Sequence, residues 1–148
     1  MGFAHVRPKG YLSPMTRTIL RALLAAAYLL AGALHVINPA PFMSITPAWV
    51  PFPAQIILFT GLCEVAGAIG LFVPRLRWWA GMMLAAYAVC VYPANVKHAV
   101  DYITHGTGGL SLWYHVPRLA FQPVIVWWAL YAGRVIDWPF HHRRGAPA

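Results

Sequence analysis

The sequence contains very little acidic charge. Of its 148 residues only three are Asp or Glu, against eleven Lys and Arg, and charged residues make up 9% of the chain. A soluble domain carries about 25% charged residues, so this chain, which is also 60% hydrophobic, is not composed like one. The composition predicts an integral membrane protein. The net charge of +8 does not indicate nucleic-acid binding, because the basic residues cluster beside apolar runs, a pattern typical of membrane topology.

Cysteine is scarce as well. Cys63 and Cys90 both fall inside apolar runs, with no CxxC and no further Cys or His at zinc spacing. Neither a disulfide framework nor a metal site is indicated, and no metal ligands are assigned. A lone Cys in a membrane helix is usually a small buried hydrophobe, and a redox role for the pair is the alternative.

Four apolar runs are long enough to cross about 30 Å of hydrocarbon as helices. They cover approximately residues 18–37, 54–73, 78–96 and 112–133. The chain is therefore expected to be all-α, with residues 18–135 forming an integral membrane four-helix bundle. Residues 1–17 and 136–148 are expected to be cytoplasmic tails, the second of them basic. A chain of this length leaves no room for a separate catalytic domain.

Three basic clusters orient these spans. They precede the first span, fill the turn between the second and third, and follow the fourth: Arg7, Lys9, Arg17 and Arg21; Arg75 and Arg77; Arg134, Arg143 and Arg144. By the positive-inside rule both termini are expected in the cytoplasm, in a multi-pass protein of a bacterial-type inner membrane. A signal peptide is the rival interpretation of the first span, because residues 31–33 resemble a cleavage site. The apolar run continues to Ile37, which favours a span.

Glu64 is the only glutamate, and no other charge lies between Pro53 and Arg75. An ionisable side chain at the centre of a membrane helix costs about 2.5 to 3.5 kcal/mol, so it is usually buried in the protein and functional. At 1.5 Å per residue, Glu64 lies about 16 Å along its helix from Arg75, and Gln122 lies about 18 Å from Arg134. The two residues are therefore expected at the same level of the membrane.

The remaining polar residues of the spans fall in the outer half of the membrane, and those on one helix are three or four positions apart. Residues at that spacing share a helix face. A bundle that pointed these faces at lipid would leave polar groups unpaired, so we expect them to converge on a shared pocket. The predicted site is His35, Glu64, Asn95, Arg118 and Gln122, with Asn38 and Tyr92 as secondary members.

The two outer connections are expected to differ. Residues 38–53 are uncharged and contain five prolines, and this segment is expected to fold back over the mouth of the bundle as a lid, because non-helical backbone at that depth needs protein or a wet cavity beside it. Residues 97–111 are expected to form a loop in which Lys97, His98 and His105 are solvated.

Structural roles are the alternative for each polar residue. Glu64 and Arg118 could form a buried ion pair that fixes helix packing, although their levels differ by about 8 Å. His35 could simply be satisfied by a hydrogen bond, and Asn38 and Asn95 could cap or end helices.

Two catalytic chemistries find little support. A haem would need two histidines at the same depth in the membrane on facing helices. Only His98 and His115 come near this arrangement, and they lie close to the water. No Ser or Cys is placed beside a His and an acid, so a hydrolase site is not indicated.

Four stretches, taken together and in order, resemble the DoxX-like family of small four-helix membrane proteins. They are GALHVINP, TGLCEVAGAIGLFVPRLRWWAG, VYPANVK and VPRLAFQPVIVWWAL, and the resemblance covers residues 18–135. The resemblance implies membrane subunits linked to quinone-dependent sulfur oxidation or to other oxidoreductase complexes, with distant relatives that look like receptor chaperones. The paired cysteines of thiol-redox membrane enzymes are missing. The family pattern falls on His35, Glu64, Pro93, Asn95, Arg118, Gln122 and Pro123.

The function expected from these observations is ligand binding. A small, partly apolar ligand, with a quinone as the candidate, would occupy the pocket. The protein would be an accessory subunit of a membrane oxidoreductase complex and would not carry electrons itself. Glu64 and His35 would exchange protons, and Arg118, Gln122 and Asn95 would bind carbonyl oxygens. No covalently bound cofactor is expected; the expected partners are the bilayer, other redox-complex subunits or further copies of the chain.

Two other functions stay open. One is a membrane chaperone or assembly factor in which the polar residues only fix the bundle. The other is a small transporter, for which an intramembrane Glu and Arg are suggestive. Four helices without a repeat enclose little pathway, so a transporter would have to be an oligomer.

Overall fold

The computed structural model of this protein describes residues 14–106 and 111–139. These residues form five helices and no strand: α1 (Pro14–Ile37), α2 (Ala40–Ile45), α3 (Pro53–Gly70), α4 (Arg77–His105) and α5 (Leu112–Ala132). The all-α prediction is confirmed for this part of the chain. Most of the two predicted tails, including Arg7, Lys9, Arg143 and Arg144, lies outside the described residues.

Three of the helices are long and apolar enough to cross a membrane. They are α1 over Met15–Ile37, α3 over Pro53–Gly70 and α4 over Arg77–His105. Large apolar side chains point outward from them, such as Leu30, Phe59 and Trp79, each more than 60% exposed, as expected for a surface that meets lipid. The fourth predicted span, α5, has 21 residues, but Arg118, Gln122 and two prolines lower its hydropathy.

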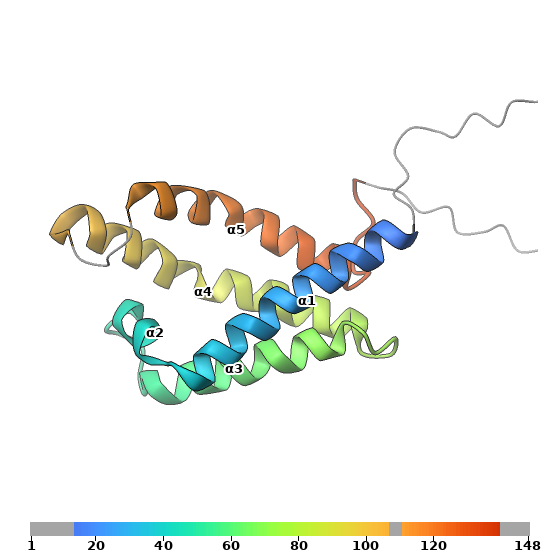
Figure 1. The fold of residues 1–148 in the computed structure, drawn as a ribbon, viewed down its shortest axis with the longest axis horizontal. Coiled ribbons are helices and arrows are strands. Elements are labelled where there is room, and N and C mark those ends of the chain that lie inside the picture. The colour runs from blue at the N-terminus through green and yellow to red at the C-terminus, as the bar shows by residue number, and fades with distance from the viewer. Residues whose placement is uncertain (1–13, 107–110, 140–148) are drawn as a thin grey trace, which may run out of the picture.

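The four long helices pack as two pairs (Figure 1). α1 packs most extensively on α3, and α4 on α5, whereas α1 meets α5 and α3 meets α4 less closely. In Figure 1 the two pairs come together at the end where α1 begins and spread apart toward the end that carries α2. We call these the arginine end and the α2 end.

Glycines allow the closest approaches between helices. A Cβ atom on Gly32 of α1 would lie 2.6 Å from the carbonyl oxygen of Gly61 of α3. A Cβ atom on Gly81 of α4 would lie 2.7 Å from the Cα of Gly133, just after α5. Both obstacles are backbone atoms and cannot rotate away. Small residues that bring helix backbones into contact are typical of membrane helix packing.

At the arginine end, arginines bind the last carbonyls of neighbouring helices. Arg21 of α1 is only 5% exposed, and its Nε donates to the carbonyl of Ala132, the last residue of α5, at 3.0 Å. Arg77 Nε donates to the carbonyl of Leu71, just after α3, at 2.9 Å. Cationic donors satisfy free carbonyls at helix C-termini and complement the helix dipole. These contacts bring residues of two predicted basic clusters to the same end of the bundle.

Arg17, which belongs to the first predicted tail, packs against the bundle. It was expected in a cytoplasmic tail, but α1 begins at Pro14 and Arg17 is 5% exposed. Its Nη2 donates to the Ile136 carbonyl at 2.9 Å and to Asp137 Oδ1 at 2.7 Å. Its guanidinium also lies 4.1 Å from the centre of the Tyr131 ring. These contacts draw both flanking segments onto the bundle, so the folded part extends beyond residues 18–135.

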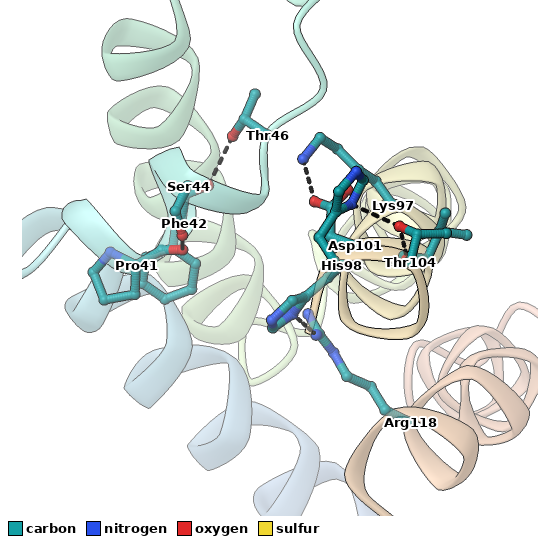
Figure 2. Close-up of polar contacts among 11 residues, drawn as sticks. Pro41, Phe42, Ser44, Thr46, Lys97, His98, Asp101, Thr104 and Arg118 are labelled. Atoms are coloured by element: carbon teal, nitrogen blue, oxygen red, sulfur yellow. Dashed lines mark hydrogen bonds and ion pairs between the residues drawn. The ribbon is translucent and has the colours of Figure 1, made fainter. Parts of the chain in front are cut away.

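α4 is longer than the third predicted span. That span was expected to end near Val96, but the helix continues to His105 and ends at Gly106, whose φ of 62° is left-handed. The hydropathy of the sequence falls near Val96, but the chain stays helical beyond it. Lys97 and Asp101 form an i,i+4 ion pair at 2.5 Å that supports the added turns (Figure 2). The loop prediction was therefore wrong for three helical residues: Lys97, His98 and His105.

The connection from α1 to α3 folds over the α2 end of the bundle, as the sequence predicts. α2 packs against both α3 and α4. The Phe42 ring meets the His35 ring edge to face, with centroids 3.9 Å apart. The Thr46 hydroxyl donates to the Phe42 carbonyl at 2.8 Å and so closes the end of this short helix (Figure 2).

Candidate functional site

A cavity of about 500 Å³ lies between the two helix pairs. Pockets that bury a small organic molecule occupy about 300 to 1,000 Å³ and are mostly apolar, with a few placed polar groups. This cavity fits that description, and residues from all five helices line it. The five residues of the predicted main site all belong to the lining: His35, Glu64, Asn95, Arg118 and Gln122.

His35 and Glu64 form a polar pair on the α1–α3 wall. His35 Nδ1 lies 2.7 Å from Glu64 Oε2, with the side chains 10% and 4% exposed. The two groups are in close contact, although they are not aligned for an ideal hydrogen bond. Gly61 permits the contact, because a Cβ there would lie 2.6 Å from the His35 Cβ. Since Nδ1 faces the carboxylate, Nε2 is the ring nitrogen available to a ligand. A histidine held in this way suits proton exchange.

Two tyrosines beside Glu64 were missed by sequence reasoning. The Tyr87 hydroxyl of α4 lies near the side chains of Glu64 and Thr60 and interacts with both. The Tyr28 hydroxyl of α1 donates to the Leu84 carbonyl at 3.3 Å, and all three of Tyr28, Tyr87 and Thr60 line the cavity. A signal was present for Tyr28, which precedes His35 by seven positions and so lies on the same helix face.

Asn95, Gln122 and Arg118 form a hydrogen-bond network on the opposite wall, between α4 and α5. Asn95 Nδ2 donates to Gln122 Oε1 at 3.2 Å, and Arg118 Nη2 donates to Asn95 Oδ1 at 2.5 Å. Gln122 Nε2 donates to the Ala88 carbonyl. The two amides are therefore occupied by partners within the protein. They fix the position of Arg118.

Arg118 is the member of this network with donors to spare. A guanidinium has five N–H donors, and the described contacts use Nη2 for Asn95 and Nη1 for His98 Nδ1, at 3.1 Å (Figure 2). The group also lies 5.4 Å from the Tyr114 ring centre. Its remaining donors are available to an oxygen atom in the cavity.

The predicted secondary members do not join the site. Asn38 follows α1 and is exposed, and its backbone N–H donates to the Leu34 carbonyl at 2.8 Å. Tyr92 is 39% exposed and is not among the residues that line the cavity. Three positions along a helix still leave about 60° between two side chains, which separates Tyr92 from Asn95.

Glu64 and Arg118 do not form the ion pair considered from the sequence. In residues 14–106 and 111–139, the contacts of Glu64 are with His35 and Tyr87, and those of Arg118 are with Asn95, His98 and Tyr114. The acid and the arginine belong to opposite helix pairs. The cavity therefore has two distinct polar walls.

His115 supports the second wall from the α2 end. It is 1% exposed, and its ring lies 4.6 Å from the His98 ring and 5.3 Å from the Tyr102 ring, measured between centroids. This aromatic cluster joins α4 to α5 beside the histidine that contacts Arg118. Within the described part of the chain, no group of three or more His, Cys, Asp or Glu side chains could hold a metal ion.

The fold and the cavity define a class: an all-helical protein with candidate membrane-spanning helices and a mostly apolar cavity between two polar walls. The chain belongs to the family described as "Domain of unknown function (DUF8561)", whose model matches residues 24–133. The matched segment contains every residue that lines the cavity. Neither the curated proteins nor the solved structures contain a match to this chain.

Proposed function

We propose that this protein is a four-helix bundle of a bacterial-type inner membrane whose cavity binds the head group of a quinone. It acts as an accessory subunit of a membrane redox complex, and the electron carrier lies on another subunit. The observation that supports this best is the pair of polar walls: His35 with Glu64 on one side of a mostly apolar cavity, and Arg118 with its network on the other.

A quinone matches these two walls chemically. It is a flat apolar ring with carbonyl oxygens on opposite edges, so one oxygen can accept from Arg118 while the other meets His35 Nε2. Reduction to the quinol adds two electrons and two protons. The electrons come from the partner subunit. His35 passes one proton to the nearer oxygen, with Glu64 stabilising the charged form of the ring, and the other oxygen takes the second proton from water. Arg118 donates hydrogen bonds to its oxygen and stabilises negative charge there.

Orientation in the membrane is part of the proposal. The meeting of Arg17, Arg21 and Arg77 at one end favours that end as the cytoplasmic one, with both termini inside. The cavity then opens in the outer half of the bundle. The resemblance to DoxX-like subunits supports the link to a redox complex, because its motifs include the residues of both polar walls.

Quinone binding can be tested with tryptophan fluorescence, because Trp49 and Trp128 line the cavity and a bound quinone quenches nearby indoles. We expect duroquinone, which has no chain, to bind saturably to the purified protein. Arg118→Ala should weaken binding about tenfold, equivalent to about 1.4 kcal/mol, and Glu64→Gln should weaken it and lower the activity of any co-purifying redox complex. Tyr92→Phe is the matched control, since Tyr92 does not line the cavity.

The same variants separate the other functions. If Arg118→Ala and Glu64→Gln both fold like the parent protein and leave quinone binding and complex activity unchanged, the proposal is wrong. Lower thermal stability and partner yield with no ligand effect would point to an assembly factor, and substrate flux in proteoliposomes would point to a transporter.

A further inference from the structure

The looser contacts between helices are the candidate openings of the cavity toward lipid. α1 packs closely on α3, and α4 packs closely on α5. The looser contacts are the seam between α1 and α5 and the seam between α3 and α4. Cavity-lining residues border both of them.

The seam between α1 and α5 is closed at the arginine end. Arg21 binds the Ala132 carbonyl there, and Trp128 Nε1 donates to the Leu20 carbonyl at 3.0 Å. Farther toward the α2 end, no hydrogen bond joins these two helices among the described residues, and Figure 1 shows the helices diverging. Trp128 therefore forms the floor of an opening.

The walls of this opening are apolar. On each helix they lie at spacings of three and four positions, which places them on one face. Ala27 and Phe121 line the cavity and are also exposed, Phe121 by 47%, and each lies seven positions from the Trp128–Leu20 contact on its own helix. We call the set the α1–α5 seam: Leu24, Ala27 and Ala31 of α1, with Phe121, Ile125 and Trp128 of α5.

The other seam, between α3 and α4, is obstructed toward both ends. Toward the arginine end, α3 and α4 pack so closely that a Cβ on Gly67 would lie 2.6 Å from the Leu84 side chain. At the other end, α2 packs on both helices. Ile56 and Cys90 line the cavity and are exposed on this side, which makes it the rival route.

We propose that the ligand is a long-chain quinone dissolved in the bilayer, which enters the cavity sideways through the α1–α5 seam and leaves its isoprenoid chain in that seam. This inference rests on the proposed function and names the ligand class within it. The polar head group lies between His35 and Arg118, while the chain lies against uncharged side chains at the lipid-facing surface. A chain directed past α2 toward water would expose its apolar length instead.

The test compares two ligands and matched variants in phosphatidylcholine nanodiscs. Ala27→Phe and Ala27→Trp narrow the seam two turns away from His35, and Ala26→Phe is the control, since Ala26 is exposed and does not line the cavity. We expect the two seam variants to weaken binding of a quinone with a ten-unit isoprenoid chain at least tenfold, with duroquinone affinity changed less than twofold. The control should change neither affinity.

Other results overturn the inference. Unchanged long-chain affinity in both seam variants, or an equal loss for both ligands, means that the chain does not lie in the seam. A selective loss in Ile56→Phe means that the chain uses the rival route. If the parent protein binds duroquinone but not the long-chain quinone, the head-group site stands and the seam proposal fails; if it binds neither, the proposed function fails.

Discussion

His35 Nδ1 lies 2.7 Å from Glu64 Oε2 and joins the end of α1 to the middle of α3. Both side chains are nearly fully buried, so neither can recover hydration if the other is removed. Breaking a buried charged pair by deleting one member typically costs about 3 to 5 kcal/mol, whereas replacing both by apolar groups is often close to neutral. The pair is therefore expected to couple the two helices energetically.

A double-mutant cycle measures this coupling. We expect His35→Leu and Glu64→Leu each to lower the free energy of unfolding, and the double variant to lower it by less than their sum, with a coupling of about 0.5 to 3 kcal/mol. Reversible denaturant unfolding in detergent gives these values. Additive effects within about 0.5 kcal/mol would show that the contact does not stabilise the fold.

Asn95 is expected to act on ligand binding through Arg118. Its Oδ1 accepts from Arg118 Nη2 at 2.5 Å, and its Nδ2 is occupied by Gln122. Asn95→Ala should weaken duroquinone binding about threefold to tenfold and should add little to Arg118→Ala, because both changes remove the same positioned guanidinium. Asn95→Asp keeps the acceptor and should bind better than Asn95→Ala. Additive losses of Asn95→Ala and Arg118→Ala, measured by fluorescence titration, would contradict a positioning role.

Much of the candidate site could be predicted from the sequence. Helix periodicity and the rarity of polar groups in the apolar runs identified five of the residues that line the cavity, since a polar side chain has few places to lie in such a helix. Periodicity could not identify partners, because it does not say which helices are neighbours. The contact of Glu64 with His35 therefore could not be predicted, because it depends on the packing of α1 on α3.

The end of α4 was missed for a related reason. Hydropathy marks where apolar surface stops, and it falls at Asn95 to Lys97. The helix continues to His105, where the ion pair of Lys97 with Asp101 and the packing of His98 and Tyr102 on His115 support the further turns. Tyr92 was chosen from this span because it is three positions from Asn95, whereas only the packing of α3 beside α4 places the Tyr87 hydroxyl near Glu64.

Glycine variants should separate backbone obstacles from flexible ones. At Gly81 an added Cβ would meet the Gly133 backbone at 2.7 Å, whereas at Gly67 it would meet side-chain atoms of Leu84, the nearest at 2.6 Å, and a side chain can shift more easily than backbone. Overpacking costs about 1 to 3 kcal/mol, so we expect Gly81→Ala to lower stability more than Gly67→Ala. Thermal unfolding in one detergent checks the order. The reverse order would show that α4 and α5 are not in such close contact.

Arg17 should contribute more to the stability of the fold than its ion-pair partner, Asp137. The Asp137 side chain is 50% exposed, and exposed ion pairs contribute about 0 to 1 kcal/mol. Arg17 is buried, binds the Ile136 carbonyl and lies over the Tyr131 ring. Arg17→Ala is therefore expected to lower the unfolding temperature clearly more than Asp137→Asn. Equal effects would mean that the ion pair itself dominates at this end.

The central claim is that the space between the two polar walls is a quinone-binding site, and a density map of the protein purified gently from its own membrane tests it most directly. We predict flat density between His35 and Arg118, continued by an elongated density between Ala27 and Phe121. A map in which the cavity is closed, with the His35–Glu64 pair packed directly against the Arg118 network and no ligand density, would contradict the claim.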